Sequence, residues 1–172
     1  MSLNADMSRS VPFLVRPEKL DGSLPGDMGF DPMGLTEIQT DLNWAANAEI
    51  KHGRICMLAL VGMIVQTSGI HLPGDQFTSV DPFEAVSKVG FAANMQIFLF
   101  IGALEIATYN KAYEDGTPGD VGFDMYGVLS ALGDEKAKER RESEIIHGRL
   151  AMIGFVGATV QTLLFHKPLL AF

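Results

Sequence analysis

The chain has 172 residues, enough for one domain, with a formal net charge of −8 and a single cysteine, Cys56. The acidic balance argues against nucleic acid as a partner, and one cysteine excludes both an internal disulfide and a cysteine metal cluster. Hydrophobic residues make up 47% of the chain, an average share, but they gather in three blocks with most of the charged residues between them.

The first 41 residues are predicted to form an N-terminal arm and loop. The opening stretch, MSLNADMSRSVP, is polar and contains no apolar run of signal-peptide length. It indicates either a mature chain whose targeting segment has been removed or a chain that never carried one.

Three long helices follow, predicted over residues 42–70, 82–109 and 138–165. Each holds an apolar block close to the roughly 17–25 residues that span a bilayer, and no proline interrupts any block. The alternative, a soluble bundle, requires polar residues every third or fourth position on an outer face, but after Arg54 the first helix has none until Gln66. So short a chain cannot bury three such helices on all sides. The sequence therefore predicts an all-α membrane protein with three transmembrane helices.

The basic residues predict the orientation of these helices. The arm carries Arg9, Arg16 and Lys19, and the connection predicted over residues 110–137, with the start of the third helix, carries several more; residues 69–80 carry none. By the positive-inside rule the N-terminus and the long connection lie on the cytosol-like side, and the tail, residues 166–172, lies on the other.

The first and third helices are copies of one sequence. From Glu49 to Thr67 and from Glu144 to Thr162 they align without a gap, with 11 of 19 positions identical. An upstream loop is repeated as well, as GDMGFDPMGL from Gly26 and GDVGFDMYGV from Gly119. Two parallel copies predict that a pseudo-two-fold axis along the membrane normal relates the first and third helices.

Each copy begins with Glu, His and Arg at the entrance to an apolar helix. Glu49 and Arg54 are five residues apart, which turns them away from each other on one helix. Because side chains lean toward the helix N-terminus, we expect reciprocal pairs between the helices, Glu49 with Arg149 and Glu144 with Arg54. A pigment-free membrane adaptor, held together by these ion pairs alone, is therefore an alternative interpretation.

These ion pairs do not explain five further electron-donating side chains in apolar surroundings: His52, Gln96, Glu105, His147 and Gln161. Hydrogen bonding between helices is one reading of them. A di-iron centre is a second, because Glu-x-x-His occurs twice, but it needs further carboxylates at the same depth and only one more helix is present. A third reading is a set of magnesium macrocycles such as chlorophyll, each held by one axial ligand, which suits single donors scattered along different helices.

The doubled motif carries a family resemblance. AEIKHGRICMLALVG, SEIIHGRLAMIGFVG and the two GDxGFD loops resemble the light-harvesting chlorophyll-binding (chlorophyll a/b-binding-like) family of plastids, over nearly the whole chain. RSVPFLVRPEKLDGSLPGDMGFDP and QIFLFIGALE are similar to its red-lineage branch, the chlorophyll a/c antennae of the fucoxanthin and peridinin type.

The resemblance implies one light-harvesting domain over residues 1–172, in which the first and third of three membrane helices cross around two central carotenoids. The implied pigments are chlorophyll a, chlorophyll c and carotenoids such as fucoxanthin, peridinin, diadinoxanthin or similar xanthophylls. The resemblance also implies that each Glu of these ion pairs both holds a chlorophyll magnesium and accepts the Arg of the other copy, and no free metal site is expected. The implied chlorophyll ligands are Glu49, His52, Gln96, Glu105, Glu144, His147 and Gln161. The residues implied at the carotenoid ends are Phe30, Asp31, Phe123 and Asp124.

The predicted function is that of a non-enzymatic antenna subunit in the plastid thylakoid membrane, with a stromal N-terminus. It would pass excitation energy to a photosystem, and the PGDVGFD loop favours photosystem I. Its partners would be a photosystem core, other antenna subunits and thylakoid lipids. A photoprotective, energy-quenching role on the same fold is the alternative.

Overall fold

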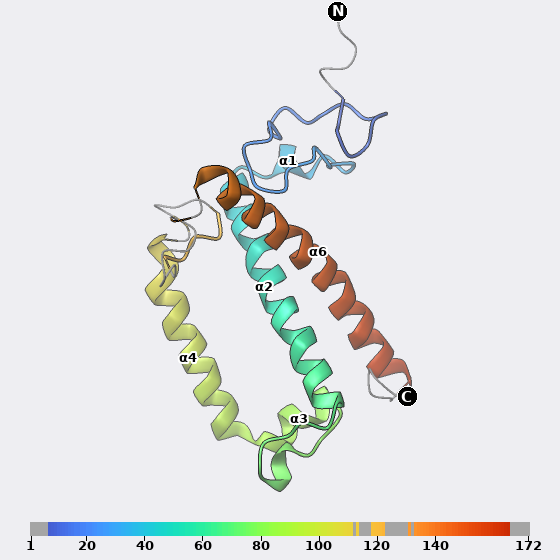
Figure 1. The fold of residues 1–172 in the computed structure, drawn as a ribbon, viewed down its shortest axis with the longest axis vertical. Helices are drawn as coiled ribbons and strands as arrows, with labels where there is room; N and C mark the ends of the chain where they lie inside the picture. The colour runs from blue at the N-terminus through green and yellow to red at the C-terminus, as the bar shows by residue number, and fades with distance from the viewer. Residues whose placement is uncertain (1–6, 112, 114–117, 123–130, 132, 166–172) are drawn as a thin grey trace, which may run out of the picture. The chain divides into compact units, whose positions relative to one another are not determined.

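The computed structural model describes residues 7–111, 113, 118–122, 131 and 133–165. In chain order it contains the short helix α1 (Leu35–Ile38), helix α2 (Leu42–Thr67), the 3₁₀ turn η1 (Asp75–Phe77), and helices α3 (Pro82–Val89), α4 (Phe91–Asn110) and α6 (Asp134–Phe165) (Figure 1). Within that part of the chain the only β-pairing is an isolated antiparallel bridge between Met7 and Val15. The predicted all-α class is therefore confirmed for the described residues.

The helices lie in two compact units, one comprising residues 1–51 and 110–146, the other residues 52–109 and 147–172. In the first unit the arm folds around Asp27, whose side chain is almost fully buried. Its two carboxylate oxygens accept the N–H groups of Gly22 and Gly29 at 2.7 and 2.8 Å, and Arg16 lies 3.6 Å away. One buried carboxylate thus satisfies two backbone donors and fixes the loop that precedes α1.

The second unit is organised by the contact between α2 and α6. Here Gly53 and Gly148 face each other so closely that a Cβ on Gly53 would lie 2.9 Å from the Cα of Gly148. Below that point Leu60 packs against Gly154, and Met63, Ala151 and Ala158 are buried. Small residues at the contact allow two backbones to touch, as is common in membrane helix pairs.

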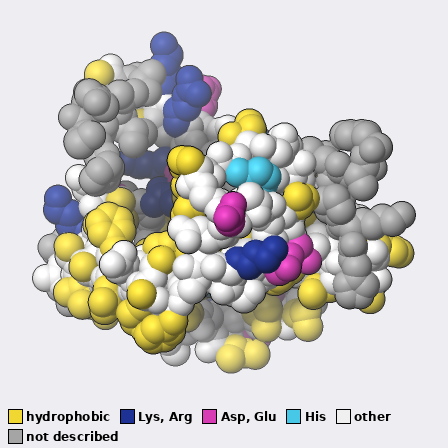
Figure 2. Space-filling model, turned by 90° about the horizontal axis from the view of Figure 1, so that it is seen from below, with side chains coloured by type: hydrophobic (Ala, Val, Ile, Leu, Met, Phe, Trp, Pro, Cys, Tyr) yellow, Lys and Arg dark blue, Asp and Glu magenta, His cyan; other side chains and the backbone are white. Residues whose placement is uncertain are grey.

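Helix α4 has no buried side chains in its apolar window. Ile106 is 81% exposed, Phe91 78% and Phe98 70%. Figure 2 shows hydrophobic side chains exposed in several places on the face seen there, among other side chains and a few charged groups. Exposed apolar surface on this scale requires a lipid, pigment or protein cover.

By length and composition, two of the described helices, α4 and α6, can cross a membrane. The crossing by α2 stays a prediction, because its apolar stretch is framed by the charged head around Glu49 and by Gln66.

The segment predicted as one helix over residues 82–109 is two helices, which corrects the prediction. Gly90 adopts φ 88° and ψ 161°, a backbone conformation that ends α3 and that other residues rarely adopt. Asp81 caps the start of α3 by accepting the Phe83 N–H, with Pro82 in its first turn. Asn94, in the first turn of α4, donates to the Val86 carbonyl at 2.8 Å and so links the two helices across the break.

The outer helices differ from their predicted bounds only at their ends. The first, expected over residues 42–70, ends at Thr67. The third, expected from residue 138, begins at Asp134. The negative charges of Asp134 and Glu135 stabilise this end, because the N-terminus is the positive end of the helix dipole.

Candidate functional site

The site predicted from sequence begins at the polar heads of α2 and α6. Glu49 and Glu144 are half-buried, whereas His52 and His147 are exposed on their helices. Each of these four residues, and each of Arg54 and Arg149, has a polar interaction partner in the structure. The cross-pairing of Glu49 with Arg149 and of Glu144 with Arg54 remains a prediction.

Gly53 and Gly148, one in each head, contact each other. Each follows a His by one position, and the two occupy the same place in the repeat. A Cβ on Gly148 would lie 3.1 Å from the Cα of Gly53, close to the 2.9 Å found in the other direction. The two helix backbones therefore touch immediately after the predicted histidine ligands.

The repeated Gly-Asp-x-Gly loops share a local geometry. Asp27 accepts the N–H of Gly29, and Asp120 accepts the N–H of Gly122, both at 2.8 Å. The paired glycines have matching left-handed φ angles, 74° and 84° for Gly26 and Gly119, and 66° and 70° for Gly29 and Gly122. Glycine is favoured there because a Cβ strains this backbone region. The sequence repeat is thus a repeat of structure in both loops.

Of the four residues implied at the carotenoid ends, two lie within the described residues. Phe30 is 64% exposed, so its ring is accessible. Asp31 supports the loop: its carboxylate accepts the N–H groups of Leu35 and Thr36, both at 2.9 Å, and the Thr36 hydroxyl. Its role at a carotenoid end stays a prediction. The hydrogen bond from that hydroxyl, followed by the one from the Thr36 N–H, lowers the pKa of Asp31. Phe123 and Asp124 lie outside the described residues.

Each of the two loops contacts the helix of the other repeat. Gly26, in the first loop, packs against the buried Ile145 of α6, and a Cβ on this glycine would lie 2.9 Å from the Ile145 side chain. In the second loop, the Gly119 N–H donates to Oδ1 of Asn47 on α2, at 2.7 Å. Sequence reasoning missed Asn47. Its position two residues before Glu49, in an otherwise apolar turn, was the available signal.

The predicted donors on the remaining helix faces are accessible. Gln96 and Glu105 on α4 and Gln161 on α6 are exposed, and they stand among exposed apolar side chains such as Ile97 and Leu104. Glu105 has a polar partner. Oxygen and nitrogen donors on apolar, uncovered faces are suited to hold the metal of a flat hydrophobic macrocycle.

A metal ion held by several side chains at one point would be a different arrangement from these separate donors. Among the described residues, no group of three or more His, Cys, Asp or Glu side chains is placed to hold a metal ion. The donors are instead dispersed along the helices, as single axial ligands would be.

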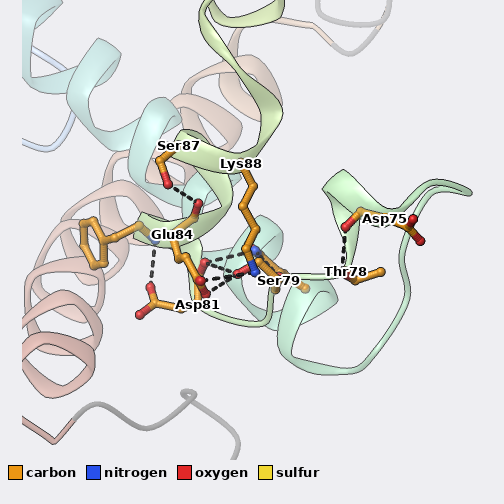
Figure 3. Close-up of polar contacts among 9 residues, drawn as sticks. Asp75, Thr78, Ser79, Asp81, Glu84, Ser87 and Lys88 are labelled. Carbon is orange, nitrogen blue, oxygen red and sulfur yellow. Dashed lines mark hydrogen bonds and ion pairs between the residues drawn. The ribbon is translucent and has the colours of Figure 1, made fainter.

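Gln66 occupies the same place in the repeat as Gln161 but has a structural role. Its side-chain amide donates to the Ser79 carbonyl oxygen at 2.7 Å and lies 3.5 Å from the Asp81 carbonyl oxygen. The Ser79 hydroxyl in turn donates to Glu84, which also pairs with Lys88 at 3.1 Å (Figure 3). The end of α2 is thereby tied to the start of α3.

The comparisons with known proteins bear on this arrangement. Residues 16–163 match the family model described as chlorophyll A-B binding protein. The chain belongs to the chlorophyll a-b binding protein family. The resemblance that the doubled motif indicated is thus confirmed, and the matched region includes α1 and all six residues of the two polar heads.

Relatives within this family come from plants and algae. The chain is 31% identical to chlorophyll a-b binding protein 4, chloroplastic, of Arabidopsis thaliana, over 88% of this chain and 66% of the relative. It is 37% identical to the fucoxanthin-chlorophyll a-c binding protein F, chloroplastic, of Phaeodactylum tricornutum, over 76% and 72%. It is 38% identical to a fucoxanthin-chlorophyll a-c binding protein, chloroplastic, of Chattonella marina var. antiqua, over 83% and 71%. The chain spans just under two thirds of the length of its Arabidopsis relative.

Proposed function

We propose that the chain is a light-harvesting antenna subunit that binds chlorophylls and carotenoids in a plastid thylakoid membrane. Bound chlorophyll would absorb light and pass the excitation toward a photosystem, while the protein holds and spaces the pigments. The observation that carries this proposal is the set of exposed donors, such as Gln96 and Gln161, standing among exposed apolar side chains on α4 and α6. Family membership supports it.

The proposed ligands are Glu49, His52, Gln96, Glu105, Glu144, His147 and Gln161. We infer that α2, α4 and α6 all span the membrane, with the N-terminus on the stromal side. The charge of a glutamate on such a span costs about 2.5–3.5 kcal/mol at the bilayer centre on insertion scales, so each needs a partner. Arg149 and Arg54 would supply the partner for Glu49 and Glu144.

A pseudo-two-fold relation between the helices is part of the proposal. Gly53 and Gly148 are equivalent in the repeat and contact each other, which is what an axis passing between them requires. The crosswise packing of the two loops is consistent with the same axis.

The pigments proposed are chlorophyll a, chlorophyll c and a xanthophyll such as fucoxanthin. Relatives named as fucoxanthin-chlorophyll a-c binding proteins favour this set over a purely green one. The partners would be a photosystem core, with photosystem I favoured by the PGDVGFD loop, other antenna subunits and thylakoid lipids. An energy-quenching role would use the same ligands and differ in the lifetime of the excited pigment.

The test is the pigment content of the purified chain. We expect Soret and red chlorophyll bands, and we expect His52→Leu to lose about one chlorophyll per chain, because a single axial ligand holds each macrocycle. His71→Leu is the matched control, since His71 lies in the connection after α2, and it should leave the count unchanged. A colourless native protein would favour the pigment-free adaptor, and bound iron in place of magnesium would favour the di-iron reading.

A further inference from the structure

The short helix α3 has two sides of different polarity. Phe83 and Val86 are three residues apart and share one side, where they are 46% and 60% exposed. Glu84 and Lys88 are one turn apart on the other side and form an ion pair at 3.1 Å (Figure 3). A helix with one exposed apolar side and one charged side is typical of helices that lie in the surface of a membrane.

The described part of the chain packs against a different side of α3. Ala85 and Val89, four residues apart, are half-buried. On the charged side the hydroxyl of the buried Ser79 donates to Glu84, so this side is tied to the connection that precedes the helix. Phe83 and Val86 remain exposed, and exposed apolar side chains that lie together indicate a contact with something else.

The neighbour of α3 in the chain indicates what that contact is. The helix ends at Gly90, and α4, which is long and apolar enough to cross a membrane, begins at Phe91. The Asn94 side chain donates to the Val86 carbonyl oxygen at 2.8 Å, so the two helices are joined by a hydrogen bond as well as by the chain. Because α4 enters the bilayer at this end, α3 lies at the level of the lipid headgroups.

The charges of this connection determine the kind of lipid surface that it suits. Residues 68–90 carry Asp75, Asp81 and Glu84 against one basic residue, Lys88. The amine of Lys88 is already paired with Glu84. Anionic headgroups attract segments rich in Lys and Arg, and a segment with a net negative charge gains nothing from them. The matching surface is therefore one of uncharged headgroups.

We propose that the apolar side of α3, formed by Phe83 and Val86, is a docking surface for uncharged membrane lipid. The two side chains enter the boundary between headgroups and acyl chains, while Glu84 and Lys88 face water. Through the hydrogen bond between Asn94 and Val86, α3 then fixes the depth at which α4 begins. This inference rests on the membrane span of α4 that is part of the proposed function.

The test measures the surroundings of spin labels on the full pigmented chain in phosphatidylcholine vesicles. In a Cys56→Ser background, single labels are placed at Val86→Cys and, as the matched control on the charged side, at Lys88→Cys. A third label, at Ile101→Cys, reports on the middle of α4. Oxygen concentrates in the acyl chains and a nickel(II) chelate stays in water. We expect the ratio of oxygen to nickel collisions to be several-fold higher at residue 86 than at residue 88.

Two changes test the side chain and the charge. Adding Phe83→Ser should raise nickel collisions at the residue 86 label several-fold, because half of the apolar surface is lost. Vesicles made of equal parts phosphatidylcholine and phosphatidylglycerol should not draw this label deeper. A deeper position there would show that anionic headgroups attract the helix, and would overturn the assignment to uncharged lipid.

The label on α4 separates this inference from the proposed function. If the residue 101 label is shielded from nickel but the residue 86 label is as open to nickel as the residue 88 label, α3 stands in water and the inference is wrong. A residue 86 label shielded from both reagents would mean that protein covers this side, which also overturns it. A residue 101 label open to nickel would instead remove the membrane span, and with it the proposed function.

Discussion

Glu84 shows how one exposed carboxylate holds a connection in place. The hydrogen bond from Ser79, followed by the contact with Lys88, lowers the pKa of Glu84 below its ordinary 4.5. A lowered pKa in the folded state means that the contribution to stability is present above the unfolded value and is lost as the pH falls through the folded one. We therefore expect the segment 68–81 to stay protected from protease from pH 7 to pH 5 and to become more susceptible only as the pH falls below 4.5.

Glu84→Gln is the control for this pH dependence, because it keeps an acceptor oxygen for Ser79 and removes the charge. The variant should show the same cleavage rate above and below pH 4.5, measured with an acid-tolerant protease. Opening of the wild-type segment between pH 7 and pH 5 would contradict the assignment.

Two glutamines at equivalent positions of the repeat show how far a sequence pattern predicts the role of a single residue. Gln66 and Gln161 occupy the same position in the repeat, so the pattern alone gives them the same role. They differ because the chain after α2 turns back and brings the Ser79 and Asp81 carbonyls to Gln66. Asn47 was missed for the same reason, since its partner lies in a distant loop and no local pattern records it.

The contact between α2 and α6 carries a prediction at the scale of elements. Gly53→Ala places a methyl group 2.9 Å from the Gly148 backbone, which must then move, and overpacking of this kind costs about 1–3 kcal/mol. We expect Gly53→Ala and Gly148→Ala each to lower the thermal midpoint of pigment release by several degrees, followed by absorbance at the red chlorophyll band.

Two further glycines on the same helices are the controls. Added Cβ atoms on Gly62 and Gly157 meet no atom within 4 Å, so alanine there adds helix propensity without a clash. Gly62→Ala and Gly157→Ala should leave the midpoint unchanged or raise it. If all four variants behave alike, the close approach does not hold the pair together.

Helix ends were the part of the fold that patterning predicted least well. The predicted segment 82–109 ignored Gly90, because a lone glycine in an apolar run is compatible with a continuous helix. Two local features break the helix there. Asp81 and Pro82 start the separate helix α3, and the Asn94 side chain donates a hydrogen bond to the Val86 carbonyl near its end. The outer helices were better predicted, because each carries a long apolar block that leaves few alternatives.

Segregation of apolar and charged residues made the class of the whole molecule predictable. Blocks of spanning length, a doubled Glu-x-x-His-Gly-Arg head and a doubled loop led to the family that the comparisons confirm. The arrangement of α4 was not predictable in this way. None of the side chains in its apolar window is buried, so its position is set by whatever covers it, and a protein sequence does not encode that cover directly.

Removing the pigments should therefore affect α4 before the pair α2 and α6. Within the second unit Met63 on α2 and Ala151 and Ala158 on α6 are buried, whereas no residue in the apolar window of α4 is.

The distances between the helices can be measured with pairs of spin labels in a Cys56→Ser background. Labels at Leu58→Cys and Ala103→Cys report on α2 and α4, and labels at Leu58→Cys and Ile153→Cys report on α2 and α6. We expect extraction of pigment into detergent to broaden the first distance distribution several-fold and to leave the second narrow, because direct backbone contact at Gly53 and Gly148 needs no pigment. Equal broadening of both would mean that pigment, and not the glycine contact, holds the pair together; no broadening of either would mean that lipid alone places α4.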